Sequence, residues 1–238
     1  MMRRLCLVIL LLVPLAAMAD ALPFQFKPDL GNTASLQRGA KLFMNYCVGC
    51  HTLSHVRYSK MAEDLNIPQD VMKDNLMMTT DNIHDQIRGT MPDKAEDWFG
   101  TAPPDLTLVA RHRGADWLYS FLLSFYVDPE QPTGTNNLVM TNTAMPWVLW
   151  PLQGYQKLAD TEQGQEPQFE LVQEGSMEPT EFRGTAGDLV NFLVYAGEPA
   201  KLVRYSLGVK VIIFLLIFTV LAYFLKREYW RDVHDDDQ

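Results

Sequence analysis

The sequence predicts a mostly α-helical domain with long loops, followed by a single membrane-spanning helix near the C-terminus. Apolar residues recur at helical spacing in several short segments, and stretches containing proline and glycine separate these segments. Residues 205–225 carry one charge, that of Lys210. At about 1.5 Å of rise per residue, this segment reaches roughly 30 Å, which is the thickness of the hydrocarbon core of a bilayer. A buried core helix is the alternative, but core helices rarely run so long without polar residues.

The first residues have the pattern of a secretory signal. Arg3 and Arg4 precede an apolar run over residues 5–15, and Ala17 and Ala19 are the small residues that a signal peptidase reads. We expect cleavage after Ala19, because the apolar run is too short to serve well as an uncut anchor. The chain then divides into a signal peptide (1–19), an exported domain (20–204), a transmembrane anchor (205–225) and a cytoplasmic tail (226–238).

The charge and the cysteines narrow the class of function. The formal net charge is −9, and loss of Arg3 and Arg4 with the signal, which holds no acidic residue, changes it to −11. Such a domain would repel nucleic acid and would favour a basic partner protein. Cys6 leaves with the signal, so the exported domain keeps only Cys47 and Cys50. A pair so close in sequence would be a poor structural disulfide.

The helices are expected in the following places. Ser35 is expected to cap a helix that continues to Tyr46, and this helix should cross a second one over residues 188–196. Gly39 would allow the close approach, and Phe43 and Phe192 would pack at the crossing. Further short helices are expected at residues 58–65, 81–89 and 116–127.

The connections are expected to be long. Residues 103–106, Pro-Pro-Asp-Leu, form a rigid turn because each proline fixes its own φ and restricts the preceding residue. Residues 153–184 are polar and acidic, and we expect a surface excursion with a small hairpin there. Gly197-Glu198-Pro199 ends the second crossing helix.

One short motif indicates a cofactor-binding site. Cys47-Val48-Gly49-Cys50-His51 is the attachment pattern of c-type haem. The two thiols add across the two vinyl groups of one haem, and the two intervening residues let a single helical turn hold both sulfurs at the vinyl separation. The adjoining His51 then supplies one axial nitrogen to the iron.

Other kinds of site that cysteine and histidine form fit this sequence less well than haem attachment. A structural zinc site needs four ligands, and neither a second cysteine pair nor a finger-like spacing of His55, His84 and His112 is present. A thioredoxin-type pair would not require His51 and would favour a βαβ setting, which the sequence lacks. A chance match is the remaining alternative.

The sixth iron ligand has several candidates. Methionine sulfur favours ferrous iron and raises the potential, and Met91 and Met145 each precede a proline that stiffens a loop. Met145 is preferred because its apolar neighbours would exclude water. Met177 lies among acidic residues, and the remaining alternatives are His84 and His112.

Residues that could contact the edge of the haem lie in the Pro-Pro-Asp-Leu turn and shortly after it. Either Arg111 or Arg113 could pair bidentately with a haem propionate. Pro103 and Leu106 could contact the haem edge.

Taken together, these pieces resemble the cytochrome c1 family, the haem subunits of quinol–cytochrome c reductase (the bc1 complex). The resemblance runs from about Leu36 to Trp230. Besides the haem motif, it rests on Gln37-Arg38-Gly39, Arg57-Tyr58, Ala102-Pro-Pro-Asp-Leu106, Ala110-Arg-His-Arg-Gly-Ala-Asp116 and Tyr195-Ala-Gly-Glu-Pro199. The chain departs from many members in its compact region after the haem motif, and it has no cysteine pair for the extra disulfide of some bacterial members.

The resemblance implies a class I cytochrome c-type haem domain with one haem c, Met145 as axial ligand and Arg111 as the propionate partner. It implies an electron carrier of the respiratory chain that accepts one electron from the Rieske iron–sulfur protein and passes it to a soluble or membrane-bound cytochrome c. Cytochrome b and membrane lipid would be its neighbours in a dimeric multisubunit complex. The short signal resembles that of bacterial members, which implies the inner membrane with the haem domain in the periplasm.

Two rival classes remain open. An anchored cytochrome of a terminal oxidase or nitrite-respiration system would share the haem motif and the anchor. It would not be expected to show the Pro-Pro-Asp-Leu and Arg-His-Arg-Gly pieces in this order. An anchored periplasmic scaffold without redox activity would carry no covalent haem.

Overall fold

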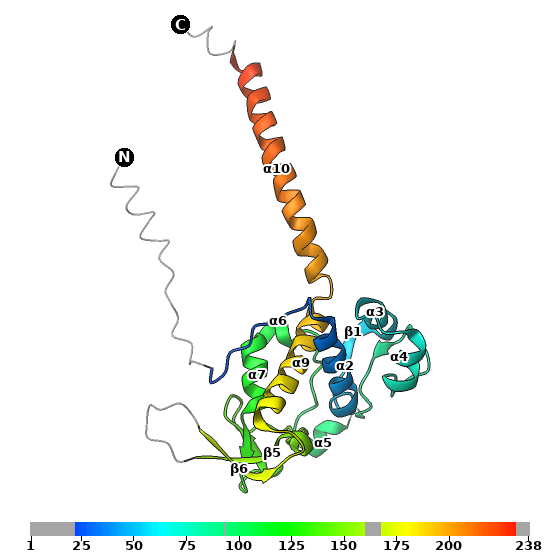
Figure 1. Ribbon diagram of the computed structural model, residues 1–238, viewed down its shortest axis with the longest axis vertical. Coiled ribbons are helices and arrows are strands. Elements are labelled where there is room, and N and C mark those ends of the chain that lie inside the picture. Colours follow the sequence, from blue (N-terminus) through cyan, green and yellow to red (C-terminus); the bar gives the residue numbers. More distant parts are fainter. Residues whose placement is uncertain (1–21, 93, 160–167, 232–238) are drawn as a thin grey trace, which may run out of the picture.

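The computed structural model describes residues 22–92, 94–159 and 168–231. The expected signal peptide (1–19) and the end of the expected tail (232–238) lie outside these residues. A helical domain with long connections occupies one end of the molecule, and the long helix α10 (Lys201–Tyr229) projects from it (Figure 1). This arrangement confirms the predicted fold class.

Two crossed helices form the centre of the domain. α2 (Thr33–Tyr46) packs against α9 (Pro179–Gly197), as predicted. Gly39 lies directly against the backbone carbonyl of Asp188, where a Cβ atom would overlap it. The rings of Phe43 and Phe192 pack at the crossing with their centroids 5.8 Å apart, and both side chains are fully buried.

Both crossing helices begin earlier than predicted. Asn32 caps α2 in place of Ser35, because the Asn32 side-chain oxygen accepts a hydrogen bond from the Ser35 backbone N–H at 3.1 Å. α9 begins at Pro179, a residue whose fixed φ suits the first helical position. Phe182 and Ala186 extend its buried face, so the polar excursion ends before residue 179.

The prediction of a helix at residues 81–89 is wrong. The Asp85 carboxylate accepts hydrogen bonds from Thr80 and Asn82, and this local bonding stabilises a turn in place of a helix. After the turn, β2 (Gln86–Ile87) pairs antiparallel with β1 (Leu53–Arg57).

The expected helix at residues 116–127 is too long. α7 (Ala115–Leu123) stops before β3 (Phe125–Val127), which pairs antiparallel with β4 (Thr135–Asn137). The pairing of Phe125 with Asn137 competes with helix formation through a contact distant in sequence, which no local pattern shows.

The remaining elements connect these parts. α3 (Tyr58–Asp64) confirms the helix expected at 58–65, and the predicted hairpin consists of β5 (Gly154–Leu158) and β6 (Phe169–Glu174). The other short helices are α4 (Gln69–Asn75), α5 (Ala95–Phe99), α6 (Val109–Arg113) and α8 (Trp150–Gln153). α6, α7 and α9 contact one another and form one wall of the domain.

α10 has the length and composition of a membrane span. Within Val203–Tyr229, the most apolar window of 18 residues has a mean hydropathy of 2.5, and none of this window is buried within the chain. A core helix would be covered by other elements of its own domain, so the alternative of a buried core helix is excluded. Among the described residues, no other helix meets these criteria.

Candidate haem site

The Cys47–His51 motif follows α2 without a break. The Cys47 backbone N–H donates to the Phe43 carbonyl at 2.9 Å, and the His51 N–H donates to the Cys47 carbonyl at 2.8 Å. This additional turn brings Cys47, Cys50 and His51 to the wall of one cavity. All three side chains therefore line the same cavity.

His51 is held in the form that can bind a metal. Its Nδ1 lies 2.9 Å from the carbonyl oxygen of Pro104. A carbonyl can only accept, so Nδ1 carries the proton and Nε2 keeps a free lone pair. Burial lowers the pKa of His51, against the opposing effects of the Pro104 bond and the Asp105 charge, and so favours the neutral imidazole.

The Pro-Pro-Asp-Leu turn is fixed against the segment that follows the motif. The Asp105 carboxylate accepts hydrogen bonds from the backbone N–H groups of Ser54 at 3.0 Å and Thr107 at 2.7 Å. Burial opposes the ionised form, yet these hydrogen bonds lower the pKa of Asp105 overall. The Leu106 N–H also donates to the Thr52 carbonyl at 2.9 Å. The turn thereby presents the Pro104 carbonyl to His51.

The cavity has room for a large apolar group. It holds about 1210 Å³ of space between protein atoms, part of it open to solvent. Pro103 and Leu106 are in its lining. Most of its other lining side chains are apolar and come from α5, α6, α7, α9 and the loop before α8: Phe99, Val109, Trp117, Leu118, Phe121, Leu122, Leu189, Leu193 and Val148.

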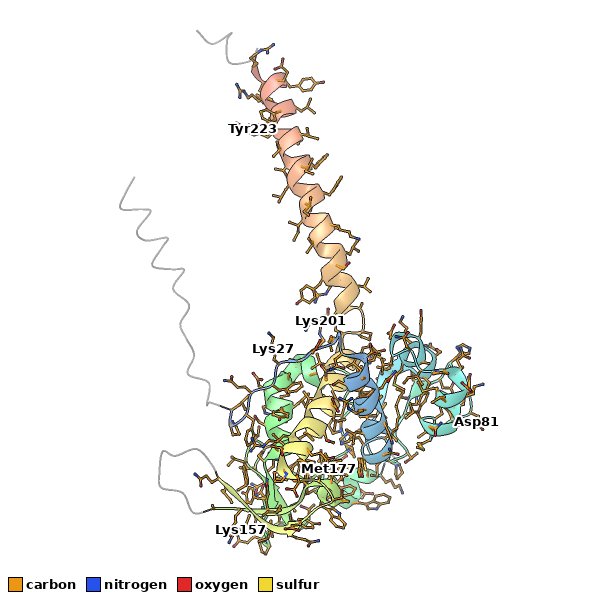
Figure 2. All side chains as sticks on the ribbon, viewed as in Figure 1. Lys27, Asp81, Lys157, Met177, Lys201 and Tyr223 are labelled. Atoms are coloured by element: carbon orange, nitrogen blue, oxygen red, sulfur yellow. The ribbon has the colours of Figure 1, made fainter. Side chains whose placement is uncertain are left out.

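Met145 lines the same cavity as His51. Met91, Met177, His84 and His112 are not among the described residues that line it. Figure 2 shows Met177 near the start of α9, where its sulfur accepts a hydrogen bond from Thr185 Oγ1 at 3.5 Å. The fold therefore favours Met145 among the candidate sixth ligands.

Sequence reasoning missed Met140, which also lines the cavity. Its side chain is 46% exposed, whereas Met145 packs against the core. The only signal in the sequence is that Met140 lies five residues before Met145 in the same loop.

A buried asparagine anchors the Met145 loop. Asn137 is 0% exposed, and its side-chain oxygen accepts hydrogen bonds from the N–H groups of Val139 at 2.9 Å and Met140 at 3.0 Å. Its amide nitrogen donates to the Phe121 carbonyl on α7 at 2.8 Å. The start of the loop is thus tied to a helix that itself lines the cavity.

We predict that Asn137→Ala destabilises the protein by about 2–4 kcal/mol, because several buried backbone groups lose their partner. Denaturant unfolding of the purified protein measures this. The variant should also weaken the absorption band that reports methionine–iron bonding. Asn75→Ala, at an exposed position on α4, is the control and should change neither property. Unchanged stability in Asn137→Ala would contradict the anchoring role.

Arg111 lies beside the cavity rather than in its lining. Its Nη1 is 3.4 Å from Glu198 Oε2, and the other Glu198 oxygen is 2.6 Å from Arg204 Nε on α10. Glu198 therefore joins the helix that flanks the cavity to the first turn of the membrane helix. Arg113 stacks over Trp117, with its guanidinium carbon 5.0 Å from the ring centroid.

The two thiols fit covalent attachment. Neither Cys47 nor Cys50 is in a disulfide. Burial raises the pKa of Cys47 to about 12 and also raises that of Cys50, so both favour the neutral thiol. Within the described residues, no three histidine, cysteine or acidic side chains converge on a metal site, so the zinc alternative has no ligand set there. The thiols, the oriented imidazole, the thioether and the apolar walls all fit a haem.

Comparison with known proteins identifies the family of this chain. The model of the cytochrome c1 family matches residues 27–233, which is most of the chain.

The chain belongs to the cytochrome c1 family.

Its relatives include bacterial and mitochondrial proteins. It is 45% identical to cytochrome c1 of Allochromatium vinosum, over 98% of this chain and 100% of that protein. It is 43% identical to a Nitrosomonas europaea protein named ammonia monooxygenase gamma subunit, over 87% of this chain and 86% of that protein. It is 28% identical to mitochondrial cytochrome c1 of Neurospora crassa, over 82% and 61% of the two chains.

Membership of the cytochrome c1 family fixes the broad function. The chain is a bc1-type electron-transfer cytochrome with a c-type haem as its cofactor. It belongs to a bc1 complex, and α10 makes it a membrane-anchored protein.

Proposed function

We propose that this chain binds one haem covalently through Cys47 and Cys50, with His51 and Met145 as the axial ligands. The observation that carries the proposal is the cavity that His51 and Met145 share, with both thiols on its wall. When bound, the haem supplies a ferric/ferrous couple that takes up and releases one electron. His51 is oriented by the Pro104 carbonyl, and the apolar lining excludes water, which favours a high potential.

The neighbouring residues have supporting roles in this proposal. Pro103 contacts the edge of the haem, and Arg111 pairs with a propionate. One Arg111 nitrogen already lies near Glu198, but a guanidinium has five N–H donors and can serve both carboxylates. Glu198 would then hold Arg111 in place from the opposite side.

We further propose the path of the electron. The chain accepts one electron from the Rieske iron–sulfur protein and passes it to a soluble or membrane-bound cytochrome c. It docks beside cytochrome b and lipid through α10, within a dimeric complex of the bacterial inner membrane. The domain of residues 20–204 lies in the periplasm after cleavage behind Ala19, and residues 226–238 lie in the cytoplasm.

Rapid mixing tests this path. A quinol is added to membranes that contain the intact complex, and the c-type and b-type haem absorbances are followed separately. The c-type haem should be reduced within milliseconds and reoxidised when oxidised cytochrome c is added. Removal of the Rieske protein should abolish the reduction. Reduction at an unchanged rate without the Rieske protein would contradict the proposed donor.

Two other assemblies are tested by the same preparation. The name of the Nitrosomonas europaea relative raises membership of an ammonia monooxygenase, and a terminal oxidase or nitrite-respiration system would use the same haem site. Each of these predicts that the chain purifies with its haem but without cytochrome b.

A further inference from the structure

A second hollow lies outside the haem cavity and has a polar lining. It takes up about 900 Å³, part of it open to solvent, between the end of β1, the loop at residues 79–85 and β2. Figure 2 shows Asp81, which belongs to this loop, on the flank of the domain beside α4. Six residues line the hollow: Arg57, Thr79, Thr80, Asp85, Gln86 and Arg88. Arg57 is part of the family pattern, but the haem site does not use it.

The two arginines of this hollow differ from the others in the domain. Within the described part of residues 22–204, neither Arg57 nor Arg88 pairs with a carboxylate or lies over an aromatic ring. All the other arginines of this region do one or the other: Arg38, Arg111 and Arg204 pair with acids, and Arg113 and Arg183 lie over rings. In a chain with a net charge of −9, two unpaired guanidinium groups in one hollow are a local excess of positive charge.

Both guanidinium groups are oriented by neutral partners. Arg57 Nη1 donates to the His84 carbonyl at 2.6 Å, and Arg88 Nη2 donates to Gln86 Oε1 at 2.6 Å. Each has further N–H donors for a ligand. The Asp85 carboxylate in the lining offsets one of the two positive charges, which leaves the hollow with a net charge of +1. Asp85 forms no ion pair with either arginine, and it accepts hydrogen bonds from Thr80 Oγ1 at 2.7 Å and from Asn82 Nδ2 at 2.8 Å.

We propose that this hollow binds an oxyanion of the phosphate class. Arginine forks match the paired oxygens of such a group, and charge-assisted hydrogen bonds to it are among the strongest in proteins. A tetrahedral oxyanion presents oxygens in several directions, which suits two guanidinium groups and the hydroxyl-bearing loop between them. The source is either free phosphate or the headgroup of an anionic lipid.

Occupancy of the hollow would act on the haem-attachment loop. Arg88 is followed at once by Gly89, whose N–H donates to Thr52 Oγ1 at 2.9 Å. The next residue, Thr90, donates through its hydroxyl to the Gly49 carbonyl within the motif at 3.1 Å. An oxyanion that fixes Arg88 would therefore stabilise a segment that packs on the Cys47–His51 turn. This binding site does not depend on the proposed electron path.

Phosphate titration of the full, haem-loaded chain in neutral detergent tests the proposal. Binding is measured by calorimetry and by the rise in Tm, with chloride at equal ionic strength as the reference. We expect saturable binding that weakens at least tenfold in the double variant Arg57→Gln/Arg88→Gln. Lys73→Gln, which removes a positive charge on neighbouring α4, should bind like the wild type. If the double variant does not fold, Arg88→Gln alone serves, since the Arg88 side chain donates to Gln86, an exposed neighbour two residues away.

Nanodiscs distinguish the two sources. If phosphatidylglycerol discs abolish the response to phosphate and phosphatidylcholine discs preserve it, the ligand is a lipid headgroup. If both preserve it, the ligand is free phosphate. No response beyond that to chloride in detergent and in both kinds of disc, or equal binding by the double variant, would overturn the proposal.

Discussion

Replacing Met145 with leucine is expected to lower the reduction potential of the haem by on the order of a few hundred millivolts. The thioether stabilises ferrous iron, and leucine fills the same space without a ligand atom. The weak charge-transfer band at the red end of the oxidised spectrum should disappear with it. A redox titration of the purified protein, with a spectrum of the oxidised form, measures both effects.

The other methionines provide matched controls for this experiment. Met140→Leu removes a second sulfur from the cavity lining, and Met91→Leu tests the other Met-Pro loop. Both variants should keep the charge-transfer band. Loss of the band in either of them, with its retention in Met145→Leu, would show that the sixth ligand is assigned to the wrong residue.

Replacing Gly39 with alanine is expected to destabilise the domain by about 3 kcal/mol or more. The added Cβ would overlap the Asp188 carbonyl and would lie 2.7 Å from Phe192 Cβ, so α2 and α9 would have to separate. Separation would also loosen the packing of Phe43 on Phe192. Denaturant unfolding of the detergent-solubilised protein measures the change.

Gly184 on α9 is the control for this effect. No atom lies within 4 Å of a Cβ built there, so Gly184→Ala should be neutral or stabilise the helix by up to about 1 kcal/mol. Equal losses of stability in Gly39→Ala and Gly184→Ala would mean that backbone freedom, rather than close helix packing, explains the glycine at residue 39.

Local patterns predicted the parts of the fold that depend on local chemistry. The haem motif has a fixed spacing, and the crossing at Gly39 follows from a small residue on an apolar helix face beside Phe43. The same patterns failed for two different reasons. β3 forms because Phe125 pairs with Asn137, a partner distant in sequence. The helix expected at residues 81–89 is replaced by a turn because the Asp85 side chain binds donors within five residues of it.

In the candidate site too, some residues could be predicted from local patterns, whereas other contacts depend on residues distant in sequence. Cys47, Cys50 and His51 were proposed from their spacing alone, and the structure places all three in the lining of one cavity. The sequence already favoured Met145 over Met91 through its apolar neighbours, and the fold adds that, of the two, only Met145 lines the cavity. The bond from His51 to Pro104 spans 53 residues, and no local signal reveals such a contact.

Purification of the intact chain in mild detergent, with a reduced-minus-oxidised spectrum and mass analysis of everything that accompanies it, tests whether the chain is the haem subunit of a bc1 complex. We expect one covalent haem on a chain that begins at Asp20, together with b-type haem, an iron–sulfur protein and quinol-dependent reduction of cytochrome c. Covalent haem without cytochrome b would contradict the proposed place in the complex, and a chain without covalent haem would contradict the haem site itself.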